Sequence, residues 1–153
     1  MMVVRERTGP VDAAEGRRLE FDRGIFGFED VDAFILRPLR DGSPLRVLRA
    51  AEGAEPVFAV IDPFILDPEY RFVLGGEDRM ALEWTGETDL TVMVVVGIPA
   101  DPNDMTANMK GPIVIHPAKG LGRQVILLGE EYPARLRVMD AVGRRRDGIP
   151  GGE

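Results

Sequence analysis

The side chains that most often perform covalent catalysis are scarce in this chain. Acyl-transfer triads join a serine or cysteine nucleophile to a histidine, and the 153 residues hold one serine, one histidine and no cysteine. Ser43 stands between a glycine and a proline, which is typical of a turn, and His116 precedes Pro117 where an apolar run ends. With no second histidine, His116 also lacks the companion ligand of a zinc site. We therefore predict that the chain is not an enzyme and that both residues are structural.

Carboxylates and amides gather in one polar stretch between two apolar runs that are rich in β-branched residues. Asp101, Asn103 and Asp104 offer the oxygen ligands that calcium prefers. If Asp101 opened an EF-hand loop, however, the glycine of the sharp turn would fall at Thr106 and the bidentate glutamate at Pro112. We therefore expect Asx turns and side-chain caps in this loop, with no metal and no cofactor. An alternative is a small ligand-binding or hydrolytic β-barrel with a concave pocket, whose clustered carboxylates would be Asp62, Asp101 and Asp104.

Length and charge limit the remaining classes of function. With 153 residues, 44% of them hydrophobic, the chain has the size of one ordinary domain. Nineteen basic and 26 acidic residues give a net charge of −7, which repels phosphate backbones and argues against direct nucleic-acid binding. An acidic surface can instead speed the encounter with a basic partner. No run reaches the roughly 18 to 20 apolar residues of a membrane span. We expect a cytoplasmic protein that does not bind membranes and is a monomer on its own.

The apolar pattern predicts many short strands separated by turn signals. Turns are expected at 41–44, 52–56 and 117–122, where glycine and proline accumulate. One short helix is expected from Glu77 to Trp84, with acidic residues in its first turn and Met80 and Trp84 on one face. We predict a mainly β, single-domain, antiparallel β-barrel-like fold with one short helix. The predicted strands are Arg18 to Phe21, Ala33 to Leu39, Leu45 to Ala50, Val57 to Ile61, Tyr70 to Leu74, Leu90 to Ile98, Thr106 to Ile115 and Gln124 to Leu128.

The two ends of the chain lack a sustained periodic pattern of apolar residues. Residues 1–18 combine charge with glycine and proline, so they are expected to form a loose arm with room for one edge strand. Residues 140–153 are expected to form a flexible tail that has nothing to pack, with a solvated basic patch at Arg144 to Arg146. The β domain is predicted to span 19–139.

Several separated strings resemble the FliW family, bacterial flagellar assembly factors, and they occur in the same order along most of the chain. The strings are Gly24-Ile-Phe-Gly-Phe-Glu29, Phe34-Ile-Leu, Ser43-Pro44, Phe58-Ala-Val-Ile-Asp-Pro-Phe64, Asp104-Met-Thr-Ala-Asn108, Pro112-Ile-Val-Ile115, Arg123-Gln-Val-Ile and Tyr132-Pro133. The resemblance implies a protein that binds newly made flagellin in the cytoplasm. When it is not so occupied, it would bind the translational regulator CsrA and block repression of flagellin messenger RNA. Because CsrA-type proteins are basic, the net charge of −7 suits such an encounter.

The same resemblance implies which residues contact a partner. Asp104 and Asn108 would either hydrogen-bond a partner or hold their loop, and Met105 would be an adaptable apolar contact. The apolar cluster that follows Asp62 either plugs a barrel end or docks a partner, and Phe28 is either a core aromatic or an exposed anchor. The predicted partner-binding residues are Asn103, Asp104, Met105, Thr106, Asn108, Asp62, Pro63, Phe64, Phe28 and Glu29.

Overall fold

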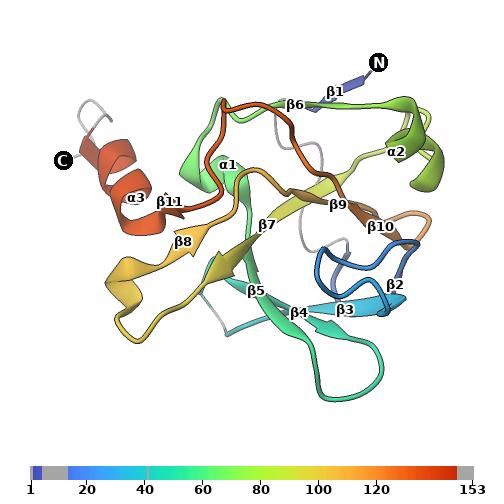
Figure 1. The fold of residues 1–153 in the computed structure, drawn as a ribbon, viewed down its shortest axis with the longest axis horizontal. Coiled ribbons are helices and arrows are strands. Elements are labelled where there is room, and N and C mark those ends of the chain that lie inside the picture. Colours follow the sequence, from blue (N-terminus) through green and yellow to red (C-terminus); the bar gives the residue numbers. More distant parts are fainter. Residues whose placement is uncertain (1, 5–13, 41, 148–153) are drawn as a thin grey trace.

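The computed structural model describes residues 2–4, 14–40 and 42–147. Its strands wrap into a barrel, with short helices and connecting segments against one side (Figure 1). The strands are β1 (Met2–Val4), β2 (Arg18–Phe21), β3 (Ala33–Pro38), β4 (Arg46–Ala50), β5 (Val57–Ile61), β6 (Phe72–Leu74), β7 (Thr91–Gly97), β8 (Thr106–Ala107), β9 (Ile113–His116), β10 (Leu121–Gln124) and β11 (Leu136–Arg137). The helices are α1 (Pro63–Leu66), α2 (Gly76–Ala81), α3 (Val138–Asp147) and the 3-10 helix η2 (Pro102–Asp104).

The barrel closes through seven strands in the order β7-β5-β4-β3-β2-β10-β9, because β9 also pairs with β7. All of these pairs are antiparallel except β2 with β10, which run parallel. The three turns expected from glycine and proline connect antiparallel neighbours, as hairpins do: β3 to β4, β4 to β5, and β9 to β10. The prediction of a mainly β, barrel-like domain is confirmed.

The barrel wall is apolar on both faces where β7 and β9 meet. Side chains of β7 alternate between an inner cluster that holds Met93 and an outer cluster that holds Val92 and Val94. In β9, likewise, Ile113 belongs to the inner cluster and Val114 to the outer one. The outer cluster is covered by the segments from Leu66 to Leu82 and from Val125 to Ala141. A strand buried on both faces reads as a continuous apolar run, which explains the Val-rich sequence of β7.

The prediction of one short helix is wrong, because the described residues contain three α-helices. The predicted helix corresponds to α2, which carries Glu77 and Asp78 in its first turn as expected. It ends at Ala81, and Glu83 then turns the chain with a φ of 51°. Trp84 is therefore not on the helix, so the prediction that Met80 and Trp84 share a helical face is also wrong; Met80 is 80% exposed and Trp84 only 9%.

Two boundaries near the C-terminal end also differ from the prediction. The last barrel strand is Leu121–Gln124, whereas residues 125–128 leave the regular ladder and keep only two backbone bonds to the opposite segment, from Val125 N–H to Pro112 and from Leu127 N–H to Lys110. Residues 140–147 of the predicted flexible tail belong to helix α3. Because Ala141 is only 2% exposed, the prediction that this tail has nothing to pack is wrong. At the other end, the edge strand allowed for in the N-terminal arm is β1, which pairs with β6. The side chains of Arg144 to Arg146 lie outside the described residues.

Candidate functional site

Asp62 caps helix α1 at the end of β5. Its Oδ1 accepts a hydrogen bond of 2.9 Å from the backbone N–H of Phe64, and Pro63 fills the first helical position, where a missing N–H costs nothing. Asp62 is 6% exposed and Pro63 is buried. Phe64 packs edge-on against Tyr70 at 5.8 Å and keeps part of its surface exposed. Of the three predicted partner-binding residues in this segment, Phe64 is thus the one with exposed surface.

The loop before β8 and the turn after it are built from side-chain caps, as predicted. Asp101 Oδ1 accepts from the N–H of Asn103 at 3.0 Å and starts η2, and Asn108 Oδ1 accepts from the N–H of Lys110 at 3.0 Å. Met105 lies between η2 and β8, and its carbonyl accepts the N–H of Val138, the first residue of α3, at 3.0 Å. The loop therefore determines where α3 begins.

Helix α3 brings two of the predicted segments together. It packs against both α1 and η2, so it joins the segment that holds Phe64 to the loop that holds Asp104 and Met105. Arg137 bridges Asp104 at 3.4 Å and Asp140 at 3.2 Å. All three charged side chains are about half exposed, so this bridge orders the surface and contributes little stability. We call this surface the α1–η2–α3 surface; it comprises Phe64, Asn103, Asp104, Met105, Arg137, Met139 and Asp140.

The third predicted segment forms a tight turn elsewhere. Gly24 has a φ of 60°, and a Cβ there would lie 2.9 Å from the carbonyl oxygen of Val31 and closer still to that of Phe28, so only glycine fits. The N–H of Phe28 donates to Ile25 at 2.6 Å, and the N–H of Gly27 donates to the Glu29 carboxylate at 3.0 Å. The latter bond lowers the pKa of Glu29.

This turn presents aromatic surface. Phe26 is 77% exposed, whereas Phe28 is 43% exposed and packs edge-on against Phe58 of β5 at 5.3 Å. Phe58 lies in β5 and Asp62 directly follows that strand, so the two residues are four positions apart, or about 13 Å along an extended chain. We call the turn at 24–29 the aromatic turn. It contacts β5 near the start of that strand, whereas the other end of β5 leads into α1 and the α1–η2–α3 surface.

Gln124 connects the aromatic turn to the segment that follows Asn108. Its Oε1 accepts from the N–H of Phe26 at 2.8 Å, and its Nε2 donates to the carbonyl of Gly111 at 3.0 Å. Sequence reasoning did not single out Gln124, although it lies in one of the strings that resemble the FliW family. The structure therefore shows two surfaces rather than one constellation of predicted residues.

The carboxylates of the alternative hypothesis are engaged separately. Asp62 caps α1, Asp101 caps η2 and Asp104 pairs with Arg137. No group of three or more His, Cys, Asp or Glu side chains gathers as metal ligands would within the residues that the structure describes. The three carboxylates therefore do not converge on one site.

His116 is fixed by hydrogen bonds inside the domain. It is 3% exposed, its Nδ1 lies 2.7 Å from the carbonyl oxygen of Leu82, and its Nε2 lies 2.7 Å from the hydroxyl of Thr88. The neutral ring satisfies both partners when Nδ1 donates and Nε2 accepts. The prediction of a structural His116 is confirmed.

None of the helices within residues 2–4, 14–40 and 42–147 is both long enough and apolar enough to cross a membrane.

The fold and surfaces define a small closed β-barrel whose exposed features suit contact with other macromolecules. The model of the FliW family, described as FliW protein, matches residues 2–138, so the chain belongs to the FliW family. The flagellar assembly factor FliW of Ruminiclostridium cellulolyticum is 33% identical over 146 residues, which cover 95% of this chain and 99% of the relative. That of Desulfitobacterium hafniense (strain DSM 10664 / DCB-2) is 35% identical over 138 residues, covering 90% and 91%.

The barrel is shared with a solved member of the family. A crystal structure of the flagellar assembly factor FliW superimposes with a TM-score of 0.73 at 29% sequence identity, covering 90% of this chain and 96% of the other. Fold and sequence thus agree over nearly the whole length. The family is one of flagellar assembly factors and not of enzymes.

Proposed function

We propose that this flagellar assembly factor binds flagellin in the cytoplasm and, when free of it, binds the translational regulator CsrA. Holding CsrA would relieve its repression of flagellin messenger RNA. The observation that carries the proposal is the family match over residues 2–138, together with relatives named flagellar assembly factor FliW that align over nearly their full length.

The charge of the chain supports a basic partner. The net charge of −7 favours a rapid encounter with a positively charged protein such as a CsrA-type RNA binder. Electrostatic steering of this kind weakens as salt screens the charges. The association rate with CsrA should therefore fall with ionic strength more steeply than the dissociation rate changes.

Two surfaces are the candidate binding sites for these partners. The α1–η2–α3 surface offers Phe64 and Met105 beside the charged Asp104–Arg137 pair, whereas the aromatic turn offers Phe26 and the partly exposed Phe28. Aromatic and methionine side chains are common anchors of protein interfaces. One partner excludes the other only if they share a surface or if the two sites carry a negative coupling free energy.

Calorimetric titration of the purified chain with CsrA and with flagellin, each alone, tests the proposal. Asp104→Lys alters the first surface and Phe26→Ser the second, and both side chains are exposed, so the variants should remain folded. Matched controls are Glu87→Lys and Met80→Ser, which change exposed residues outside both surfaces. We expect at least one surface variant to weaken one partner by about tenfold while the controls bind normally. Absence of binding to both partners would overturn the proposal.

A further inference from the structure

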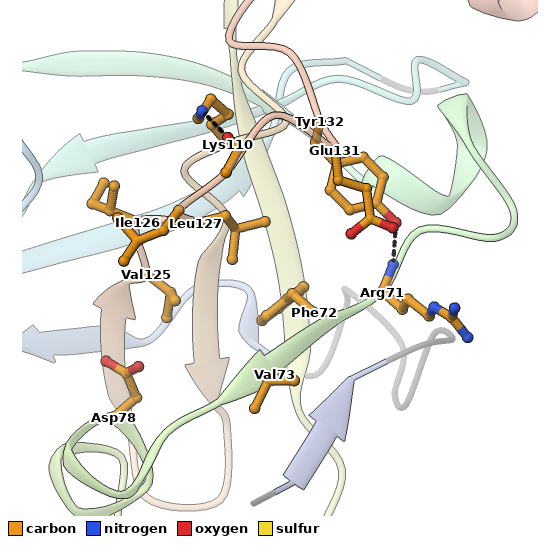
Figure 2. Close-up of a pocket in the computed structure, with 12 residues that line it drawn as sticks. Arg71, Phe72, Val73, Asp78, Lys110, Val125, Ile126, Leu127, Glu131 and Tyr132 are labelled. Carbon is orange, nitrogen blue, oxygen red and sulfur yellow. Dashed lines mark hydrogen bonds between the residues drawn. The ribbon is translucent and has the colours of Figure 1, made fainter.

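A groove of about 630 Å³ lies beside β6, apart from the two surfaces described above. Figure 2 shows β6 on one side and the segment from Val125 to Leu127 on the other, with Asp78 toward one end and Tyr132 toward the other. Leu128 and Gly129 also line the groove. Its volume falls in the range of sites that hold small ligands or short peptide segments. The groove belongs to neither the α1–η2–α3 surface nor the aromatic turn.

One side of the groove is a strand edge. β6 pairs with β1 along its other edge in a two-stranded sheet. Just before β6, the N–H of Arg71 donates to the hydroxyl of Tyr132 at 3.0 Å, and Tyr132 lines the groove. Backbone N–H groups alternate in direction along an extended chain, so the N–H and C=O of Val73 point to the same side as the N–H of Arg71. Among the residues that the structure describes, β6 pairs with β1 alone, so the edge that faces the groove can accept another strand.

The other side of the groove is apolar. Val125 is 5% exposed and joins Leu127 in the outer core cluster, while the neighbouring Ile126 and Leu128 are 53% and 93% exposed. Four consecutive apolar residues, two of them largely in water, lie along a groove with an open strand edge. Contiguous exposed apolar surface of this kind typically marks a binding site.

The Tyr132 end of the groove is acidic. A smaller depression there is lined by Asp67, Glu69 and Glu131 together with Arg71, which gives three carboxylates and one guanidinium, or a local charge of −2. Glu69 and Glu131 form no ion pair with any residue in the described part of the chain. A cationic side chain would be favoured at this end.

At the opposite end, Asp78 pairs with the buried Arg123 at 3.0 Å, and Arg123 also pairs with Asp22 and Glu77. These carboxylates are engaged in ion pairs, whereas Glu69 and Glu131 pair with no cation in the described part of the chain, so a cationic side chain of a bound peptide is favoured at the Tyr132 end.

We propose that this groove binds an extended peptide segment of a partner protein, which adds as a third strand along β6. The segment carries apolar side chains at alternate positions, which pack against the apolar residues 125–128, and a lysine or arginine that meets Glu131. Main-chain hydrogen bonds to Val73 supply affinity, and the alternate side chains and the cation supply specificity. A third strand also completes a sheet that is marginal with two strands.

Selection of random short peptides displayed on phage against the folded chain tests this proposal. We expect enriched sequences that alternate apolar and polar residues and place a lysine or arginine at one end. Synthetic peptides of these sequences should bind about tenfold more weakly to Glu131→Lys and to Leu128→Asp. Both positions are exposed, so the variants should fold. Glu87→Lys and Leu39→Asp, exposed residues that do not line the groove, are the matched controls and should bind as the wild type does.

A second measurement uses the wild-type chain alone. Amide hydrogen exchange of Val73 should slow when a selected peptide is bound, because its N–H enters a new ladder. Three outcomes would overturn the proposal: no enriched sequence, enriched sequences with helical spacing of apolar residues, or equal binding to wild type and both groove variants. Dimerisation of the chain that is competed by the peptide would also overturn it, since the occupant would then be a second copy.

Discussion

Closure of the barrel should depend on the absence of a side chain at position 122. Gly122 lies on β10 opposite Phe21 of β2, in the one parallel pair of the barrel. A Cβ at this position would lie 2.5 Å from Cζ of Phe21 and 3.0 Å from its Cδ1. Phe21 is 2% exposed and packs edge-on against Phe34 at 5.0 Å, so its ring has no free space to enter. Gly122→Ala must therefore displace a core aromatic side chain.

The expected loss of stability follows from this overlap. Overpacking a well-packed core costs about 1–3 kcal/mol. For a domain of this size, that loss lowers the melting temperature by roughly 2–10 °C. Urea unfolding followed by circular dichroism gives the free energy directly, and an unchanged m-value would show that the denatured state is unaffected.

A double-mutant cycle separates this cause from a general effect of alanine. Phe21→Leu removes the ring atoms that alanine would meet, so Gly122→Ala should cost less in the Phe21→Leu background than in the wild type. Gly76→Ala is the matched control, because nothing lies within 4 Å of a Cβ there. If Gly122→Ala were as stable as the wild type, or if the two losses simply added, the steric explanation would be refuted.

Three further predictions concern the predicted partner-binding segments. Gly24→Ala should displace the aromatic turn, because its Cβ would meet the carbonyl oxygen of Phe28, and NMR chemical shifts confined to that turn would report the change. Asp62→Ala should lower the free energy of unfolding by about 1–2 kcal/mol in urea, the usual cost of removing a helix cap; no loss would show that the cap is dispensable. Glu29 has a pKa below its ordinary value of 4.5 because the N–H of Gly27 donates to it, so its contribution to stability is present above that value and lost as the pH falls through the folded pKa. Glu29→Gln should accordingly be less stable than the wild type at neutral pH and approach it in acid, whereas a constant difference across this range would contradict the assignment.

Most of the barrel follows from local patterns. The strands from β2 to β5 and their hairpins were predictable because alternating or β-branched runs end at turns rich in glycine and proline. The parallel pairing of β2 with β10 was not predictable, because it joins residues about a hundred positions apart through closure of the whole sheet.

The helices that sequence reasoning missed depend on tertiary packing. Helix α1 has four residues, too few for a helical period, and its apolar sequence resembles a strand end. Helix α3 contains Gly143 and a run of charged residues, so its pattern resembles a solvated tail. It packs against α1 and η2, and its buried Val138 and Ala141 belong to the outer core cluster; no local pattern in the sequence indicates these contacts.

The candidate surfaces were predictable only in part. The capping roles of Asp101 and Asn108 follow from the tendency of these residue types to form turns. Burial of Asp62 and Pro63 could not be read from the sequence, because it depends on how α1 meets the core. No pattern in the sequence predicts the groove beside β6, because its two sides come from residues 71–73 and 125–129, which are far apart along the chain. The apolar residues of the second segment predict only an ordinary strand.

A competition titration tests the central claim most directly. The chain is first saturated with CsrA, and flagellin is then added while the release of CsrA is followed by analytical size exclusion or by a label on CsrA. The proposed function predicts that flagellin displaces CsrA in proportion to its concentration, and that the freed CsrA again represses translation of flagellin messenger RNA in vitro. A stable complex of all three proteins in which CsrA stays inhibited would contradict partner switching, even if each protein bound the chain alone.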